Sequence, residues 1–191
     1  MSDTDDELVA RYKDGDASAF NLIVQRHRTP LINFIYRYLN DRDNAEDLTQ
    51  EVFIRIYRNI KNYNPDKASF RTWMYRIAAN LCKNEIRNRN RHSKVLINSF
   101  TSKNEEDQKL EDILDPSPGS DVKLEEKELQ KALSAAISNL SEKFRLVLIL
   151  RDIEGMSYDE IAKVIGMPEG TVKSRLNRAR LMLKERLKNE L

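Results

Sequence analysis

Apolar residues recur three and four positions apart along most of the chain, and no segment rich in Val, Ile and Thr alternates with a period of two. The first spacing is typical of amphipathic helices, and the missing alternation argues against strands. The sequence therefore predicts an all-α fold. The expected helices span 5–13, 17–39, 43–61, 69–91, 127–139, 142–153, 158–165 and 169–187.

Two features in the first long helical segment bear on where its helix begins and breaks. Asp16 is expected to cap the helix 17–39, because a carboxylate at this position accepts a first-turn amide. Thr29-Pro30 is the place where this helix could break and start afresh, since proline removes an amide donor and favours a first turn.

The C-terminal helices carry the signals of a helix-turn-helix. Ser157 with Glu160 three residues later forms a capping box, and Gly166 lies where a helix C-terminus favours a left-handed residue. A turn through 166–168 then leads into the helix 169–187, which in this arrangement enters the major groove of DNA. The apolar residues expected to pack the two helices together are Ile161, Ala162, Ile165, Val172, Leu176 and Ala179.

The polar face of the last helix carries cations and hydroxyls, with no acid between Glu169 and Glu185. A solvated helix face usually mixes both signs of charge, so this face is suited to an anionic partner. The residues expected to reach base edges are Thr171, Lys173, Ser174 and Arg178, and those expected to meet phosphates are Arg175 and Arg180.

The formal net charge of +2 over 191 residues hides an uneven distribution. Residues 1–16 and 95–130 carry net charges of −4 and −6, whereas 17–94 and 131–191 carry +8 and +4. The basic blocks favour a polyanionic partner, and the acidic, polar segment 95–130 has the composition of a flexible linker. The expected domains are therefore 1–94 and 131–191, tumbling semi-independently in the free protein.

The helix 69–91 places a cationic stripe beside an aromatic one. Phe70, Trp73, Ile77 and Leu81 share one side, and the neighbouring side carries Arg76, Asn80, Lys83, Arg87 and Arg91. Basic residues beside exposed aromatic rings are what single-stranded nucleic acid requires. Phe70 is expected in the core, whereas Trp73 could lie in the core or face nucleic acid.

The helix 43–61 combines acids with apolar side chains on its outer face. Asp47 and Gln50 line up with Ile54, and Phe53 and Tyr57 flank that row. Acids beside exposed apolar groups indicate a protein-binding patch rather than a DNA-binding face.

Several classes of protein are excluded by what the sequence lacks. With one Cys, no run of about 18 apolar residues and no signal-peptide pattern, the chain is expected to be soluble and intracellular, without membrane insertion. His27 and His92 have no further ligands at metal-binding spacing, and Gly166 and Gly170 form no phosphate loop. No cofactor, metal or catalytic residue is therefore expected. A stand-alone helix-turn-helix transcription regulator remains the alternative to a polymerase-dependent factor, and it would need a dimerisation helix or ligand pocket.

The segments "DLTQEVFIRIYR", "FRTWMYRIAANL" and "GMSYDEIAKVIGMPEGTVKSRLNRARLML" stand in one order and spacing that resembles the extracytoplasmic-function (ECF) sigma factors, group IV of the sigma-70 family. The resemblance spans nearly the whole chain. It implies a sigma-2-like bundle and a sigma-4-like helix-turn-helix domain, joined by the acidic linker, in a cytoplasmic protein that directs transcription initiation. The implied partners are core RNA polymerase, through its β′ clamp helices and β subunit, promoter DNA and an anti-sigma factor, and no small-molecule substrate is implied.

The same resemblance implies roles for individual residues. It places Asp47, Gln50, Glu51 and Phe53 against the polymerase clamp helices. It implies a pocket for an extruded base of the minus-ten element in the loop 62–69, and contact with the melted strand further along the helix. The residues assigned to the minus-ten element and melting are Asn62, Asn64, Lys67, Ser69, Trp73, Arg76, Asn80, Lys83 and Arg87. Those assigned to the minus-thirty-five element are Thr171, Lys173, Ser174, Arg175 and Arg178.

Overall fold

The computed structural model describes residues 3–99 and 132–190, and every regular element in these residues is a helix, which confirms the all-α prediction. Residues 100–131, which include most of the expected linker and the start of the expected helix 127–139, lie outside the described residues. The N-terminal elements are α1 (Asp5–Lys13), α2 (Ala17–Leu39), α3 (Arg42–Asn59), a 3₁₀ turn at Ile60–Asn62, and α4 (Phe70–Ser99). The C-terminal elements are a helix at 132–138, α6 (Glu142–Leu148), a π-helix at Ile149–Ile153, α7 (Tyr158–Ile165) and α8 (Glu169–Glu190).

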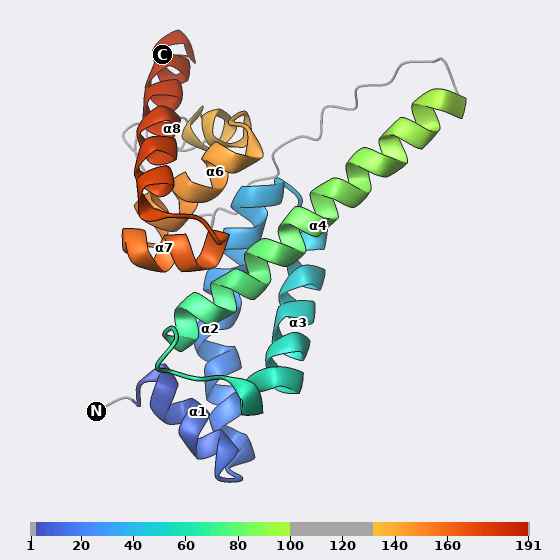
Figure 1. Cartoon of the computed structure of the whole chain (residues 1–191). Coiled ribbons are helices and arrows are strands. Elements are labelled where there is room, and N and C mark those ends of the chain that lie inside the picture. The colour runs from blue at the N-terminus through green and yellow to red at the C-terminus, as the bar shows by residue number, and fades with distance from the viewer. Residues whose placement is uncertain (1–2, 100–131, 191) are drawn as a thin grey trace, which may run out of the picture.

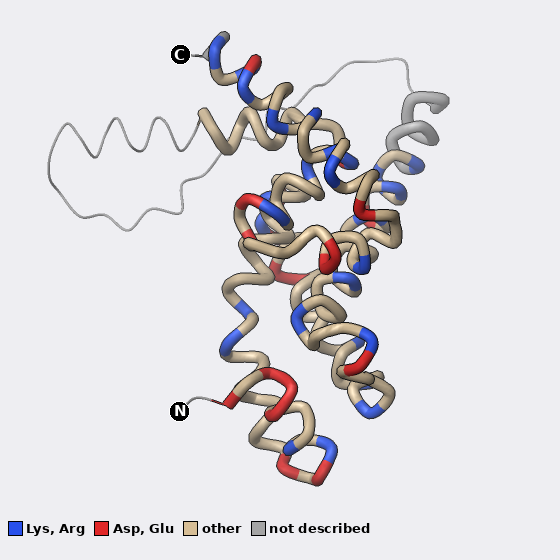
Figure 2. The backbone as a smooth tube through the Cα atoms, turned by 60° about the vertical axis from the view of Figure 1, so that its left-hand side comes forward, with Lys and Arg blue, Asp and Glu red and all other residues tan. Residues whose placement is uncertain are grey.

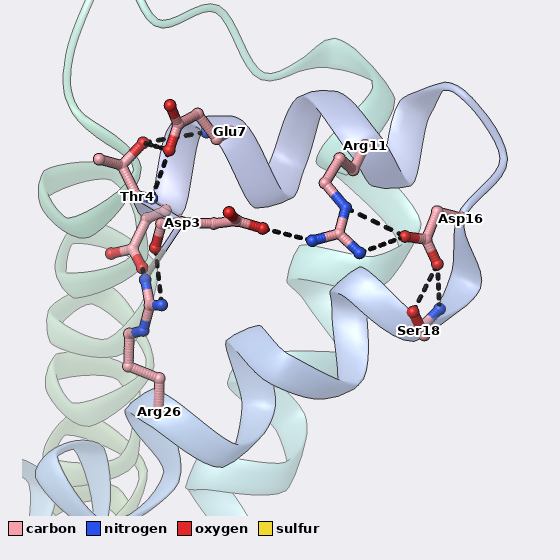
Figure 3. A network of polar contacts seen from close by, with 8 residues as sticks. Asp3, Thr4, Glu7, Arg11, Asp16, Ser18 and Arg26 are labelled. Atoms are coloured by element: carbon pink, nitrogen blue, oxygen red, sulfur yellow. Dashed lines mark hydrogen bonds and ion pairs between the residues drawn. The ribbon is translucent and has the colours of Figure 1, made fainter. Parts of the chain in front are cut away.

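Polar contacts fix the start of the chain against α2 (Figure 3). Thr4 and Glu7 form a capping box at α1, and Arg11 bridges Asp3 and Asp16. The Asp16 carboxylate accepts the amide of Ser18, as expected for the cap of α2, and the Ser18 hydroxyl and Arg11 lower its pKa to about 2. Local ion pairs and helix caps therefore hold the first residues of the chain and α1 against the start of α2.

A second polar contact joins α1 to α2 beneath the surface. Asp5 lies 2.6 Å from the Arg26 guanidinium and 2.8 Å from Nε2 of His27, which is 8% exposed. Burial raises the pKa of Asp5, but the hydrogen bonds and charges of these two partners outweigh burial, so the pKa is lowered. His27 is thus a satisfied, buried side chain that helps to hold α1 in place.

Helix α2 runs through Pro30 without a break, so the break considered at Thr29-Pro30 does not occur. Proline lacks the amide hydrogen that an interior helix position normally donates, and Pro30 lies on the exposed side of the helix. Directly after the proline, Leu31 and Phe34 have no exposed surface. Their packing into the core holds the helix together across the interruption.

Helices α2, α3 and α4 enclose the core of the N-terminal domain, with α1 packed on α2 (Figure 1). Asp41 caps α3 through the Asn44 amide and also pairs with Arg89 of α4 at 2.6 Å. Helix α4 continues to Ser99, so residues 95–99 belong to a helix rather than to the expected linker. The largest fully buried side chains of this domain include Ile23, Phe34, Tyr38, Ile56, Phe70, Met74 and Tyr75.

The C-terminal domain has the expected helix-turn-helix. The Ser157 hydroxyl accepts the Glu160 amide at 3.2 Å, and the Glu160 carboxylate accepts the Ser157 amide at 2.8 Å, completing the capping box. Gly166 ends α7 with φ of 69°, a conformation that side chains disfavour. The buried residues between the helices are those predicted, with Ala162 half-buried beside them.

The two domains pack against each other in this structure. Helix α7 lies beside α4, and α6 lies beside the end of α2, where the Arg145 guanidinium donates to the Tyr38 carbonyl oxygen at 2.5 Å (Figure 1). The semi-independent motion expected of the free protein stays a prediction. The composition of the linker, on which it rests, carries no information about polar groups that meet across the two domains.

Candidate nucleic-acid interface

The loop between α3 and α4 is anchored at its aromatic residue. The Tyr63 hydroxyl lies 2.6 Å from the Asp6 carboxylate and 2.9 Å from the Ala68 carbonyl oxygen, and Lys13 donates to the Tyr63 carbonyl at 2.7 Å. Burial and the adjacent Asp6 both raise the pKa of Tyr63, so its hydroxyl keeps its proton. The loop is thus tied to α1 before any partner binds.

This anchored loop forms one wall of a cavity of about 300 Å³. Such a volume lies at the lower end of the range for ligand pockets. Five of the residues assigned to the minus-ten element line it: Asn62, Asn64, Lys67, Trp73 and Arg76. The other lining residues are Tyr63, Ala68, Thr72 and Lys163, the last of which comes from α7 in the other domain. Ser69 lies outside the lining, and its hydroxyl accepts the amide of Thr72 at the start of α4.

Trp73 belongs to both the core and the surface. The centroid of its ring lies 5.3 Å from the ring centroid of Tyr63 and 5.9 Å from that of Phe70. Phe70 is fully buried, as expected. The same side chain is partly exposed and also lines a second cavity of about 320 Å³, together with Asn62 and Asn80. The sequence left open whether Trp73 lies in the core or faces nucleic acid. In the structure one side of the indole is packed and another side faces the cavities.

The cationic stripe on α4 extends beyond these cavities, and Figure 2 shows Lys and Arg positions (blue) along the second half of this helix. Arg76, Asn80 and Arg87 are exposed, and Lys83 is partly buried. Lys83 and Arg87 line a third cavity of about 230 Å³. Burial and the positive charge of Arg175 lower the pKa of Lys83. Helix α7 of the other domain packs along α4, the helix that carries this stripe.

The recognition helix α8 exposes most of the residues predicted to reach bases. Lys173, Ser174 and Arg178 are exposed, whereas Thr171 is partly buried. Lys173 lies 3.6 Å from Glu169, but both side chains are about half exposed, and such a pair contributes little to stability. The Ser174 hydroxyl donates to the Thr171 carbonyl oxygen at 3.0 Å. These side chains are available to a ligand on the outer face of α8.

The two arginines predicted to meet phosphates have different surroundings. Arg180 donates two hydrogen bonds to Asp152, so it joins α8 to the π-helix. Because the Arg180 side chain stays half exposed in this pair, its contact with phosphate stays a prediction. Arg175 is half-buried, and its positive charge contributes to the lowered pKa of Lys83. The sequence could not show either environment, since both partners are distant along the chain.

The predicted polymerase-binding face of α3 is only partly as expected. Asp47 and Gln50 are exposed, and Glu51 pairs with Arg55 at 2.7 Å. Phe53 is 9% exposed and belongs to the core, so its assignment to the exposed patch is wrong. The other two apolar residues predicted there, Ile54 and Tyr57, are 43% and 57% exposed, as expected. The ring of Tyr57 meets that of Phe20 edge-on and that of Tyr12 at a tilt, and it extends the patch toward α1.

Across 3–99 and 132–190, no three His, Cys, Asp or Glu side chains are grouped so that they could hold a metal ion. Within those same ranges, no helix combines the length and the apolar character needed to cross a membrane.

Two family models match this chain, one for each domain. Residues 23–92 match the model of Sigma-70 region 2, and residues 130–183 match that of Sigma-70, region 4. The first range contains the loop cavity and the cationic stripe, and the second contains the helix-turn-helix. The geometry and the family models thus divide the chain in the same way.

Similar proteins extend this match over nearly the full length. The RNA polymerase sigma-H factor of Pseudomonas aeruginosa is 37% identical over 180 residues, which cover 92% of this chain and 90% of that protein. The ECF RNA polymerase sigma-E factor of Haemophilus influenzae is 34% identical over 186 residues, covering 96% and 95%. The fold is also similar to that of the sigma factor RpoE from Bartonella quintana, solved in complex with the anti-sigma factor NepR, with 24% identity, a TM-score of 0.68 and coverage of 88% and 96%. This chain therefore belongs to the extracytoplasmic-function sigma factors of RNA polymerase.

Proposed function

We propose that this sigma factor reads the minus-ten element with its N-terminal domain and the minus-thirty-five element with α8, while α3 binds core polymerase. The observation that carries the proposal is the anchored loop cavity beside Trp73 and the cationic stripe, in the half that matches region 2. An aromatic ring next to cations suits a single strand, because bases stack on the ring and phosphates pair with the cations.

The cavity suits one extruded base of the melted strand. Its lining combines the rings of Tyr63 and Trp73 with amide groups from Asn62 and Asn64, which can donate to and accept from a base edge. Because Tyr63 is already fixed by hydrogen bonds, binding a base requires little further ordering of the loop. Unstacking a base costs a few kcal/mol, and contacts in this cavity offset that cost.

The recognition helix supplies the second contact with promoter DNA. Lys173, Ser174 and Arg178 are exposed near the start of α8, where a helix in the major groove meets base edges. An arginine can donate two hydrogen bonds to guanine, so Arg178 is the residue assigned to direct readout. Arg175 and Arg180 are assigned to phosphate contact, and Arg180 also serves within the domain.

The outer face of α3 is assigned to the polymerase. Asp47 and Gln50 provide polar contacts, and Ile54 and Tyr57 provide the apolar contacts without Phe53, which is buried. An interface with an apolar centre and a polar rim is typical of specific protein complexes. This assignment rests on exposure and on the family.

A stand-alone transcription regulator is not favoured, because both domains match sigma-factor regions and the relatives named above are RNA polymerase sigma factors. The chain is assigned no catalytic activity of its own, in keeping with its family. We place its action in the cytoplasm, where core polymerase meets DNA. The fold shared with the Bartonella quintana complex also motivates an anti-sigma factor as regulator.

In-vitro transcription tests the whole proposal. The purified chain is added to core RNA polymerase with a library of promoter sequences, and the transcripts are sequenced. We expect initiation from a subset of templates that share two spaced elements, and no such transcripts from core alone. Failure to bind core in the same mixture would overturn the assignment.

A further inference from the structure

A small polar cluster joins the two domains at the start of α4. Glu154 follows the π-helix and leads into the helix-turn-helix, and its carboxylate accepts a hydrogen bond from the Tyr75 hydroxyl of α4. The guanidinium of Arg71 lies 3.6 Å from the same carboxylate and donates to the carbonyl oxygen of Glu154. Thr72 donates to Glu160 at 3.4 Å. The turn before α7 is thus held by the first turns of α4.

The burial of this cluster makes the contact depend on domain packing. The Glu154 side chain is 9% exposed and Tyr75 is 1% exposed. A buried carboxylate is costly unless it is hydrogen-bonded or paired, and both partners given above for the Glu154 carboxylate come from α4. Burial and the neighbouring Glu154 raise the pKa of Tyr75, so its hydroxyl remains a donor at neutral pH. When the domains part, water takes over these partners, which makes the contact reversible.

The packed arrangement brings the two candidate DNA-binding faces together. Lys163 of α7 lines the same cavity as Trp73 and Arg76, and α7 packs along α4. A base entering the cavity would meet this lysine, and the helix-turn-helix cannot move to a distant promoter element without leaving α4. Two separated promoter elements cannot both be read from this conformation.

Like charges on the two faces oppose the packing, so a favourable contact must hold it. We propose that Glu154, Tyr75 and Arg71 form an autoinhibitory interdomain latch, which keeps the free sigma factor closed until core polymerase binds the open form. The latch itself is a property of the free chain, and only the opening by polymerase rests on the proposed function. A ligand that binds one conformation shifts the population toward it, and the polymerase needs no direct contact with Glu154.

The latch predicts a measurable opening of the free protein. Tyr75→Phe removes the donor while keeping the ring that packs 5.0 Å from Phe34, and Glu154→Ala removes the acceptor. A hydrogen bond to a charged group is strong enough that either change should lower the closed-to-open ratio about tenfold. The apparent affinity for DNA is proportional to the fraction of the protein that is in the open, DNA-binding conformation. The affinity of the free chain for nonspecific duplex DNA should therefore rise by up to about tenfold.

The experiment uses the full chain with dyes at Asn21→Cys on α2 and Lys188→Cys on α8, both exposed positions. The native Cys82 is fully buried, and burial raises its pKa to about 12, so it does not react with the dyes. Energy transfer, duplex affinity and circular dichroism are measured for wild type, each variant and the double variant. Glu185→Ala is the matched control, since it removes one exposed acid from α8 without touching the latch.

Both latch variants should lower energy transfer and raise duplex affinity, with less than additive effects in the double variant and unchanged circular dichroism. Tyr75→Phe matters most, because it changes no charge. The latch would be overturned if the two latch variants showed the same energy transfer and duplex affinity as Glu185→Ala. It would also be overturned if the effects of Tyr75→Phe and Glu154→Ala simply added in the double variant. If the wild-type chain directs no transcription with core polymerase while both variants still lower energy transfer and raise duplex affinity, the proposed function is contradicted and the latch is not.

Discussion

Replacing Trp73 with alanine should weaken promoter opening in a way that depends on one base of the promoter. The indole is partly exposed, lines two cavities and packs on Tyr63 and Phe70. Stacking of a base on an aromatic ring is worth about 1–3 kcal/mol, so Trp73→Ala should lower the stability of the open complex by roughly 5- to 150-fold. Trp73→Phe should recover most of that loss.

The variant also loses packing, and the two effects must be separated. Truncating a fully buried Trp costs about 3–5 kcal/mol, and a partly exposed one lies at or below the low end of that range. Phe70→Leu is the control, because Phe70 is fully buried, touches the same rings and lines neither cavity. It should lower the free energy of unfolding in urea while leaving the open complex nearly unchanged.

An abasic site in the non-template strand decides the mechanism. Open complexes form with each variant on promoters that carry one abasic position at a time, and a fluorescent base analogue next to it reports melting. At the position that stacks on Trp73, wild type and Trp73→Ala should become equal, since the base that the ring holds is missing. An undiminished difference at every position of the minus-ten element would refute the stacking role.

Three further outcomes follow from the other faces of the molecule. Reversing Asp47 and Glu51 to lysine should weaken binding to core polymerase at least about tenfold with unchanged circular dichroism, and core binding as tight as that of wild type would remove this face from the interface. Arg178→Ala should cost about 1–3 kcal/mol at one base pair of the minus-thirty-five element, whereas Arg175→Ala should weaken all sequences alike, as competition binding with single-base substitutions will show. Asp5→Asn should lower the free energy of unfolding at pH 7 by about 1 kcal/mol, a modest value because part of the carboxylate stays in water. Since the pKa of Asp5 is lowered in the folded protein, that difference should persist above about pH 4 and shrink as the pH falls through the folded pKa, and urea titrations at several pH values that show no such convergence would contradict the role.

The helix-turn-helix could be predicted from sequence because its signals are local. Ser157 and Glu160 are three residues apart, and Gly166 marks the turn by its own backbone preference. The same holds for the cap at Asp16. Each of these residues makes its decisive contact within a few positions, so the pattern contains the whole explanation.

The surroundings that the sequence did not reveal come from distant parts of the chain. Phe53 follows Val52 on a helix that packs against both α2 and α4, so the buried side of α3 is wider than a single stripe. Arg180 finds Asp152 28 residues away, and Lys163 reaches the loop cavity from the other domain. Periodicity shows which side of a helix is apolar, but it cannot show how many neighbours that helix will have.

The contact between the two domains depends on the number of residues in the π-helix Ile149–Ile153, which directly precedes Glu154. Here the Glu154 amide donates to the carbonyl of Ile149, five residues back, instead of four as in an α-helix. Removing one residue from 149–153 would restore ordinary helical bonding and turn every following residue by about 100° relative to α6. Asp152 and Arg180, which tie this segment to α8, would lose their alignment together with Glu154. Deleting one residue here is therefore expected to break the contact between the two domains without changing Glu154, Tyr75 or Arg71.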